Sequence, residues 1–171
     1  MVSADVNVPG HVENKLEGQV MTQAKWQIHQ GSIEEILSVE QQIPEFSQPK
    51  TQADILQRLS GRTYLALIAS CEGQPVAYKL GYEQAPQQFY SWIGAVLPAY
   101  RGKGLARALL LEQERWCREQ GFSHIEVKTM NRFKTMLQML VSHDYHIAEL
   151  TQPAVSSQTL LDMQIRFRKA L

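Results

Sequence analysis

The chain has 171 residues, of which 44% are hydrophobic and 20% charged, and its formal net charge is zero. A chain of this length is expected to form one domain with a sizeable core, and the balanced charge argues against general binding to nucleic acid or to a membrane surface. Cys71 and Cys117 lack the spacing of metal ligands, so we predict no metal site, two reduced thiols and a cytoplasmic protein. No apolar run is long enough to cross a bilayer.

Residues 1–22 differ in pattern from the rest of the chain. They are polar, are interrupted by Pro9 and Gly10, and contain scattered valines without a sustained hydrophobic period. We interpret this segment as an N-terminal tail or a loosely docked extension, and residues 23–171 as the folded domain.

The domain begins with a strand and two helices. Apolar and polar residues alternate over 24–30, which is typical of a half-buried strand. Ser32, with Glu35 three residues later, predicts a capping box at the start of a helix, and Pro44 ends that helix. A second helix is predicted over 52–59.

Three strands joined by short turns follow. Residues 63–70 are a continuous apolar run, which indicates a central strand covered on both faces. Residues 76–83 return as its hairpin partner, and residues 88–96 form the third strand. Gly94 inside the third strand predicts a bulge or a close approach of another backbone.

The third strand leads through a glycine-rich, basic connection into a helix over 103–120. Glycine permits tight turns and close approach to a ligand. The first N–H groups of a helix lack internal partners and carry the positive end of the helix dipole, so this connection is a candidate phosphate cradle. It is not a P-loop, because Lys103 is followed by Gly104 instead of Ser or Thr. A simple turn without a ligand is the alternative.

The remaining elements alternate between strand and helix. Residues 123–129 are predicted to pair in parallel with residues 88–96, because a right-handed crossover through a helix connects them. Asn131 is the predicted N-cap of the next helix. The apolar positions of this helix are Phe133, Met136, Leu137, Leu140 and Val141. Two further strands are predicted, one beginning near Asp144 and one over 159–168.

This order of elements predicts an α/β (α+β) domain with a mixed, mostly antiparallel sheet of about seven strands and helices on both faces. The string Arg101-x-x-Gly104-x-Ala106 and the helix at Asn131 resemble those of the GCN5-related N-acetyltransferase (GNAT) family. The resemblance spans residues 24–168, and it implies that the parallel strands splay apart where Gly94 interrupts their pairing.

The resemblance implies that acetyl-CoA is the cosubstrate. Its pantetheine arm would lie along the free backbone of the splayed strand, and its diphosphate would meet the phosphate cradle. The implied cofactor-binding residues are Ile93, Ala95, Val96, Leu97, Arg101, Gly102, Lys103, Gly104, Leu105, Ala106 and Asn131. The implied reaction is direct attack of a primary amine on the thioester in a ternary complex.

The groups that handle protons are less well defined by the sequence. Glu45 lies in a proline-flanked loop on the expected acceptor side and is the first candidate to bind or deprotonate the amine, although a solvated loop acid is the alternative. Glu83 and Glu126 are weaker candidates, and we expect Glu126 at solvent or at an interface. Many family members have a tyrosine that protonates the leaving thiolate, but Leu140 occupies the matching position here.

The acceptor side offers three aromatic candidates. Phe46, Tyr90 and Trp92 line an acceptor pocket or belong to the core. The acceptor is a small-molecule or protein amine, and the sequence leaves a homodimer open. A non-catalytic acyl-CoA sensor or adaptor on the same fold is the alternative function, and a small interaction domain is a third.

Overall fold

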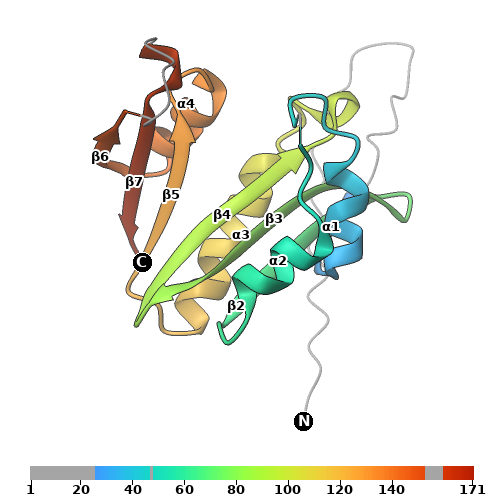
Figure 1. Cartoon of the computed structure of the whole chain (residues 1–171), viewed down its shortest axis with the longest axis horizontal. Coiled ribbons are helices and arrows are strands. Elements are labelled where there is room, and N and C mark those ends of the chain that lie inside the picture. The colour runs from blue at the N-terminus through green and yellow to red at the C-terminus, as the bar shows by residue number, and fades with distance from the viewer. Residues whose placement is uncertain (1–25, 47, 153–159) are drawn as a thin grey trace, which may run out of the picture.

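The computed structural model describes residues 26–46, 48–152 and 160–171, so the extension expected at residues 1–22 lies outside the described part of the chain. The described strands form one seven-stranded sheet in the order β1-β2-β3-β4-β5-β7-β6 (Figure 1). The strands are β1 (Trp26–Gln30), β2 (Tyr64–Cys71), β3 (Gln74–Ala85), β4 (Gln88–Val96), β5 (His124–Met130), β6 (His146–Thr151) and β7 (Gln164–Ala170). The helices are α1 (Ile33–Glu40), α2 (Gln52–Leu59), α3 (Leu105–Glu119) and α4 (Lys134–Ser142), with 3₁₀ turns η1 (Pro98–Tyr100) and η2 (Leu160–Asp162).

Strand directions follow the prediction. In the described sheet β4 and β5 pair in parallel, whereas the other neighbouring strands pair antiparallel. The chain passes from β4 to β5 through α3, as expected for a crossover between parallel strands. The mixed, mostly antiparallel sheet with one parallel pair is therefore confirmed.

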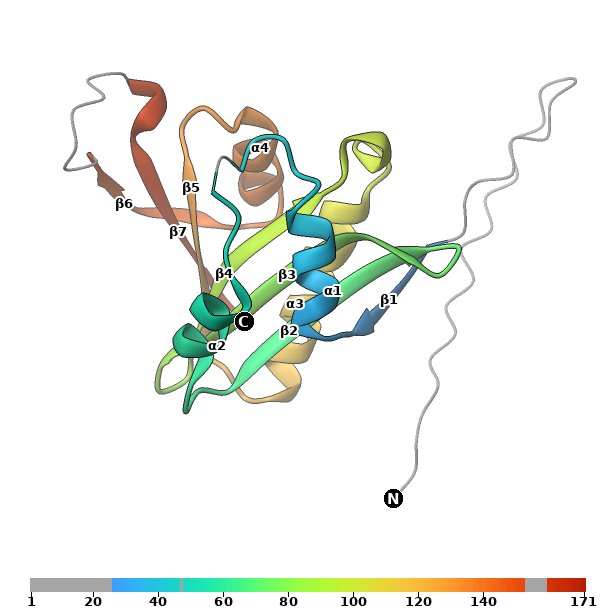
Figure 2. The same ribbon diagram turned by 45° about the vertical axis from the view of Figure 1, so that its right-hand side comes forward.

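Helices cover both faces of the sheet (Figure 2). On one face α1 and α2 pack over a core that includes Ile36 and Ile55. On the other face α3 and α4 pack over a larger core that includes Leu109, Leu140 and Phe167. None of the described helices is both long enough and apolar enough to cross a membrane.

Local signals start the first two helices where the sequence predicts them. The Ser32 hydroxyl accepts a hydrogen bond from the Glu35 N–H at 3.2 Å, and the Glu35 carboxylate accepts one from the Ser32 N–H at 2.8 Å. Thr51 and Asp54 form the same reciprocal capping box at the start of α2. Such boxes satisfy N–H groups that a helix cannot satisfy internally.

The start of the last strand differs from the prediction. β7 begins at Gln164, and Leu161, which alternates with the strand residues in the sequence, belongs to η2 and is exposed. The main-chain carbonyls of Leu161 and Met163 accept hydrogen bonds from the N–H groups of Arg132 and Asn131. These carbonyls therefore hold the turn after β5 instead of continuing a strand.

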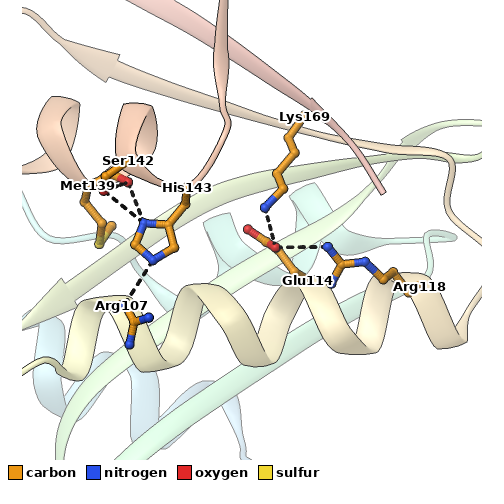
Figure 3. Close-up of polar contacts among 7 residues, drawn as sticks. All are labelled: Arg107, Glu114, Arg118, Met139, Ser142, His143 and Lys169. Carbon is orange, nitrogen blue, oxygen red and sulfur yellow. Dashed lines mark hydrogen bonds and ion pairs between the residues drawn. The ribbon is translucent and has the colours of Figure 1, made fainter.

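A buried ion pair of Glu114 links α3 to strand β7. Its Oε2 accepts hydrogen bonds from Lys169 Nζ on β7 at 2.8 Å and from Arg118 at 3.2 Å (Figure 3). The Glu114 side chain is buried and that of Lys169 is 14% exposed. Because α3 also packs against β2, β3 and β4, this ion pair connects these three strands with β7 through the helix.

We predict that Glu114→Gln lowers the free energy of unfolding by about 3 kcal/mol, because it leaves Lys169 largely buried without its carboxylate. Glu119→Gln on the same helix removes an ion pair with Arg115 in which both side chains are about half exposed, and the expected loss is within about 0.5 kcal/mol. Urea denaturation of the two variants measures both values. Equal losses would show that the buried pair contributes no more than the exposed one.

Candidate functional site

The parallel strands β4 and β5 are paired over only part of their length. The last paired residues are Ser91 and Val127, although β4 continues to Val96 and β5 to Met130. Beyond this point β4 remains paired with β3, and β5 with β7. The sheet therefore divides, as Figure 1 shows, and the splayed pair implied by the sequence is confirmed. We call the point beyond Ser91 and Val127 the fork.

A β-bulge at Trp92 coincides with the fork. The register between β3 and β4 shifts between Leu80 and Gly81, which leaves Trp92 as an additional residue on β4. As a result the consecutive side chains of Trp92 and Ile93 both pack toward the core under α1 and α2. A bulge bends its strand and increases its twist, which turns β4 away from β5.

The expectation that the parallel pairing is interrupted at Gly94 is wrong, because the pairing of β4 with β5 already ends at Ser91. The bulge lies at Trp92, and Gly94 is opposite Lys79 of β3 in regular antiparallel register. The other expectation for this glycine, a close backbone approach, is confirmed, because a Cβ at Gly94 would lie 3.0 Å from the Tyr78 carbonyl oxygen.

The edge of β4 beyond the fork presents main-chain groups that have no strand partner. The Leu97 N–H donates to the Val76 carbonyl, and Val96 is opposite Ala77. This pattern makes Val96 a non-hydrogen-bonded position relative to β3, and alternation gives Gly94 the same orientation. The N–H and C=O groups of Gly94 and Val96 therefore point toward the gap, whereas those of Ile93 and Ala95, two of the predicted cofactor contacts, point toward β3.

The candidate phosphate cradle has the backbone geometry of a tight glycine turn at the start of a helix. Gly102 and Gly104 have φ angles of +73° and +83°, and Gly104 is the N-cap of α3 without a side-chain capping bond. Within the described residues no protein acceptor binds the N–H groups of residues 102–107. Nothing lies within 4 Å of a Cβ placed at either glycine. The cradle is therefore an open set of donors at the positive end of a helix dipole.

Two cations that have no carboxylate partner among the described residues flank these donors. Lys103 Nζ lies 5.0 Å from the centre of the Tyr100 ring. Arg107 Nε donates to His143 Nε2 at 3.0 Å, and His143 Nδ1 lies 2.8 Å from the Met139 carbonyl oxygen (Figure 3). Because a carbonyl only accepts, the proton belongs on Nδ1 and Nε2 is the acceptor for Arg107. This contact holds the first turn of α3 against the end of α4.

Arg101 joins the cradle to the loop between α1 and α2. Its Nη1 and Nη2 donate to the two carboxylate oxygens of Glu45 at 2.6 and 3.0 Å, and its Nε donates to the Val96 carbonyl at 3.0 Å. The hydrogen bonds from Arg101 hold the pKa of Glu45 below its ordinary value. Glu45 is therefore a weak base as long as this ion pair persists.

Asn131 is not the helix cap that the sequence predicts. Phe133 is the N-cap of α4 and makes no side-chain capping bond. The Asn131 side chain instead donates to the Leu160 carbonyl at 2.9 Å, because the turn after β5 is pinned to η2. The predicted apolar face of α4 is also less buried than expected, since Val141 is 60% exposed.

Glu126 is buried, which corrects the expectation of a solvent or interface position. Its Oε1 accepts from Arg168 Nε at 2.9 Å and Nη2 at 2.5 Å. Its Oε2 has no hydrogen bond in the described structure and lies 3.9 Å from Arg166. Glu126 is opposite Tyr90, one residue before the fork. The alternation of Arg166 and Arg168 on the last strand is the sequence signal that could have indicated its partners.

The aromatic candidates of the acceptor side come together with one residue that the sequence analysis missed. The Tyr82 ring makes edge-on contacts with Tyr90 and Trp92, with ring centres 5.6 and 5.8 Å apart. Phe46 packs against the same core under α1 and α2. On the other face Leu140 is fully buried and offers no proton donor.

Comparisons with known proteins agree with this geometry. The family model described as Acetyltransferase (GNAT) family matches residues 32–139. No curated protein sequence matches the chain at a significant level. The ribosomal-protein-S18-alanine N-acetyltransferase from Escherichia coli superposes with a TM-score of 0.74 at 15% identity, covering 85% of this chain and 94% of that chain.

Two further solved structures contain the cosubstrate or its product. The yncA protein from Salmonella typhimurium, solved with acetyl-CoA, has a TM-score of 0.70 at 12% identity and covers 85% of this chain and 93% of that chain. A Bacillus subtilis acetyltransferase in complex with CoA has a TM-score of 0.67 at 16% identity, with coverages of 86% and 99%. The chain belongs to the GNAT acetyltransferase family.

We predict that Arg101→Gln raises the pKa of Glu45 toward its ordinary value, because the bidentate hydrogen bonds that stabilise the carboxylate are lost. NMR titration of the side-chain carboxyl carbon measures the shift. Arg115→Gln, which changes a cation paired with other acids on α3, is the control and should leave Glu45 unchanged. An unaltered Glu45 pKa in Arg101→Gln would mean that the ion pair does not persist in solution.

Proposed function

We propose that this protein transfers an acetyl group from acetyl-CoA to a primary amine of a small molecule or a protein by direct attack in a ternary complex. The observation that carries the proposal is the open phosphate cradle beside the unpaired edge of β4. When bound, acetyl-CoA supplies a thioester carbonyl for the amine to attack and a thiolate that leaves.

In this proposal the N–H groups of residues 102–106 hold the diphosphate, with Lys103 adding charge. The pantetheine arm lies along the β4 edge, where Gly94 and Val96 offer main-chain donors and acceptors. Leu97, the next residue after β4, extends this edge toward the cradle. A free N–H near the bulge polarises the thioester carbonyl and stabilises the oxyanion.

Arg101 has two roles in the same scheme. It occupies the Val96 carbonyl and the Glu45 carboxylate, and a diphosphate competes with both for the guanidinium. Once Arg101 turns to the diphosphate, the pKa of Glu45 rises toward its ordinary value and the freed carboxylate receives the amine proton. In this scheme the Glu45 carboxylate becomes available to the amine only after acetyl-CoA has bound.

The sensor function rests on Leu140, since a buried leucine cannot protonate the leaving thiolate. A thiolate with a pKa of about 8.5 leaves without an acid, so we favour the enzyme. Release of the CoA thiol from acetyl-CoA, measured across an amine library, separates the two functions. Binding of acetyl-CoA without amine-dependent release would establish the sensor.

The cradle is tested by Gly104→Ala. A Cβ at a φ of +83° is strained, so the loop must rearrange and its N–H groups lose their common direction. We expect affinity for acetyl-CoA and for desulfo-CoA, measured by calorimetry, to fall at least about tenfold. Gly61→Ala is the matched control, because Gly61 also has a positive φ (+70°) and open space around it but lies after α2. Equal affinities in the two variants would refute the cradle.

The proton acceptor is tested by Glu45→Gln. We expect kcat with an amine acceptor to fall about a hundredfold, within the usual range for a general base, and the ascending limb of the pH–rate profile to move or disappear. Glu126→Gln is the comparison, since Glu126 is the second carboxylate near the fork and is held by Arg168. A normal pH profile in Glu45→Gln, with the loss in Glu126→Gln, would transfer the role to Glu126.

A further inference from the structure

The cations of the described residues divide into those with a carboxylate within ion-pair distance and those without one. The second group is Arg58, Arg62, Lys79, Lys103, Arg107, Lys128 and Lys134. Lys103 and Arg107 flank the cradle, where phosphate groups account for them. Lys79 is buried between β3 and α3, and Lys134 opens α4. The other three cations call for a separate explanation.

Arg58, Arg62 and Lys128 lie on one aromatic cluster. The Arg58 guanidinium is 5.2 Å from the ring centre of Trp92, the Arg62 guanidinium is 5.0 Å from that of Tyr82, and Lys128 Nζ is 5.7 Å from that of Tyr90. Arg58 also donates to the Tyr82 hydroxyl at 3.4 Å. The three cations are exposed, whereas the rings beneath them are buried or half-buried. We call these three cations and three rings the cationic platform.

The cationic platform borders the fork on the face opposite the cradle. Trp92 is the bulge residue, and Tyr90 is opposite Glu126 in the last part of the paired region. The rings pack with the core under α1 and α2, not with the core under α3. An amine that approaches the fork from the α1 and α2 side therefore passes this surface.

No described carboxylate lies within ion-pair distance of Arg58, Arg62 or Lys128. Glu126 is bound by Arg168, and Glu40 accepts from Tyr78 and pairs with Lys50. Glu83 follows Tyr82 on β3 and so points to the opposite face of the sheet. The platform thus presents unpaired positive charge next to apolar ring surface, which suits an anionic ligand with a hydrocarbon part.

We propose that the acceptor is an amine that also carries a carboxylate or phosphate group, and that Arg58, Arg62 and Lys128 bind this anionic group. The inference rests on the proposed acetyl transfer, whose acceptor it specifies. The anion is held by charge-assisted hydrogen bonds, and the hydrocarbon part lies on the rings.

Acceptor pairs that differ only in the anion test the proposal. The twenty amino acids are compared with their amides, and aminoethyl phosphate with ethanolamine, by release of the CoA thiol from acetyl-CoA. We expect at least one anionic acceptor to exceed its uncharged counterpart about tenfold or more in kcat/KM. The two sets distinguish a carboxylate from a phosphate. A preference for uncharged amines or diamines throughout would overturn the proposal.

Variants then assign the effect to the platform. Arg58→Gln and Lys128→Gln should each raise KM for the anionic acceptor about tenfold and leave KM for acetyl-CoA and for the uncharged counterpart unchanged. Arg115→Gln on α3 makes the same change of charge outside the platform and should have no effect. Equal changes of KM for both acceptors, or none, would overturn the assignment.

Product binding keeps the proposal testable if turnover fails. Calorimetry in the presence of CoA compares N-acetyl amino acids with N-acetyl amino acid amides. Tighter binding of the carboxylates that Arg58→Gln abolishes would support the anion site even if no amine is acetylated, and the proposed function alone would then fail. Absence of both turnover and selective binding would overturn both.

Discussion

One additional residue in β4 determines where this protein can hold its cosubstrate. The bulge at Trp92 bends β4 where its pairing with β5 ends, so the main-chain groups of Gly94 and Val96 face the gap without strand partners. Unpaired main-chain groups are unfavourable unless water or a ligand satisfies them. The same bulge directs Trp92 and Ile93 to one face. The rings of Tyr82, Tyr90 and Trp92 therefore lie on the face of the sheet opposite the cradle. A single change in register therefore separates the candidate cradle from the aromatic rings on the opposite face.

Features that depend on neighbouring residues could be predicted from the sequence. The capping boxes at Ser32 and Thr51, the positive φ angles of the cradle glycines and the parallel pair all follow from short-range patterns. Features that depend on distant partners could not. The bulge is defined by the register in which β3 and β4 pair. Tryptophan is a common strand residue, so its presence at position 92 does not indicate a bulge. Glu126 is buried because Arg168 and Arg166 lie beside it on a strand that is distant in the sequence. Asparagine is a common helix N-cap, but the Asn131 side chain instead donates a hydrogen bond to the Leu160 carbonyl of η2.

A net charge of zero conceals an uneven distribution of charge. Four of the acids that pair with cations lie on α3 or β5, namely Glu112, Glu114, Glu119 and Glu126. Five of the seven described cations without a carboxylate partner gather at two places on opposite sides of the fork, the cradle and the cationic platform. Composition excludes a large uniform field, but it says nothing about such local surfaces. Two separate groups of cations are consistent with the proposal that two anionic substrates meet at the fork.

The ion pair between Arg101 and Glu45 connects these two sides. Both side chains are close to half exposed, and pairs of this kind contribute little to folding stability. Exchange of Glu45 for a diphosphate therefore costs the fold little, whereas it changes both ends of the site: the Val96 carbonyl is released at the gap, and the carboxylate is released at the loop between α1 and α2. A pair that is weak for stability and bidentate in geometry suits a contact that the proposed reaction breaks in each cycle. In that proposal acetyl-CoA binds before the amine, because an amine that arrives first finds Glu45 already bound by Arg101.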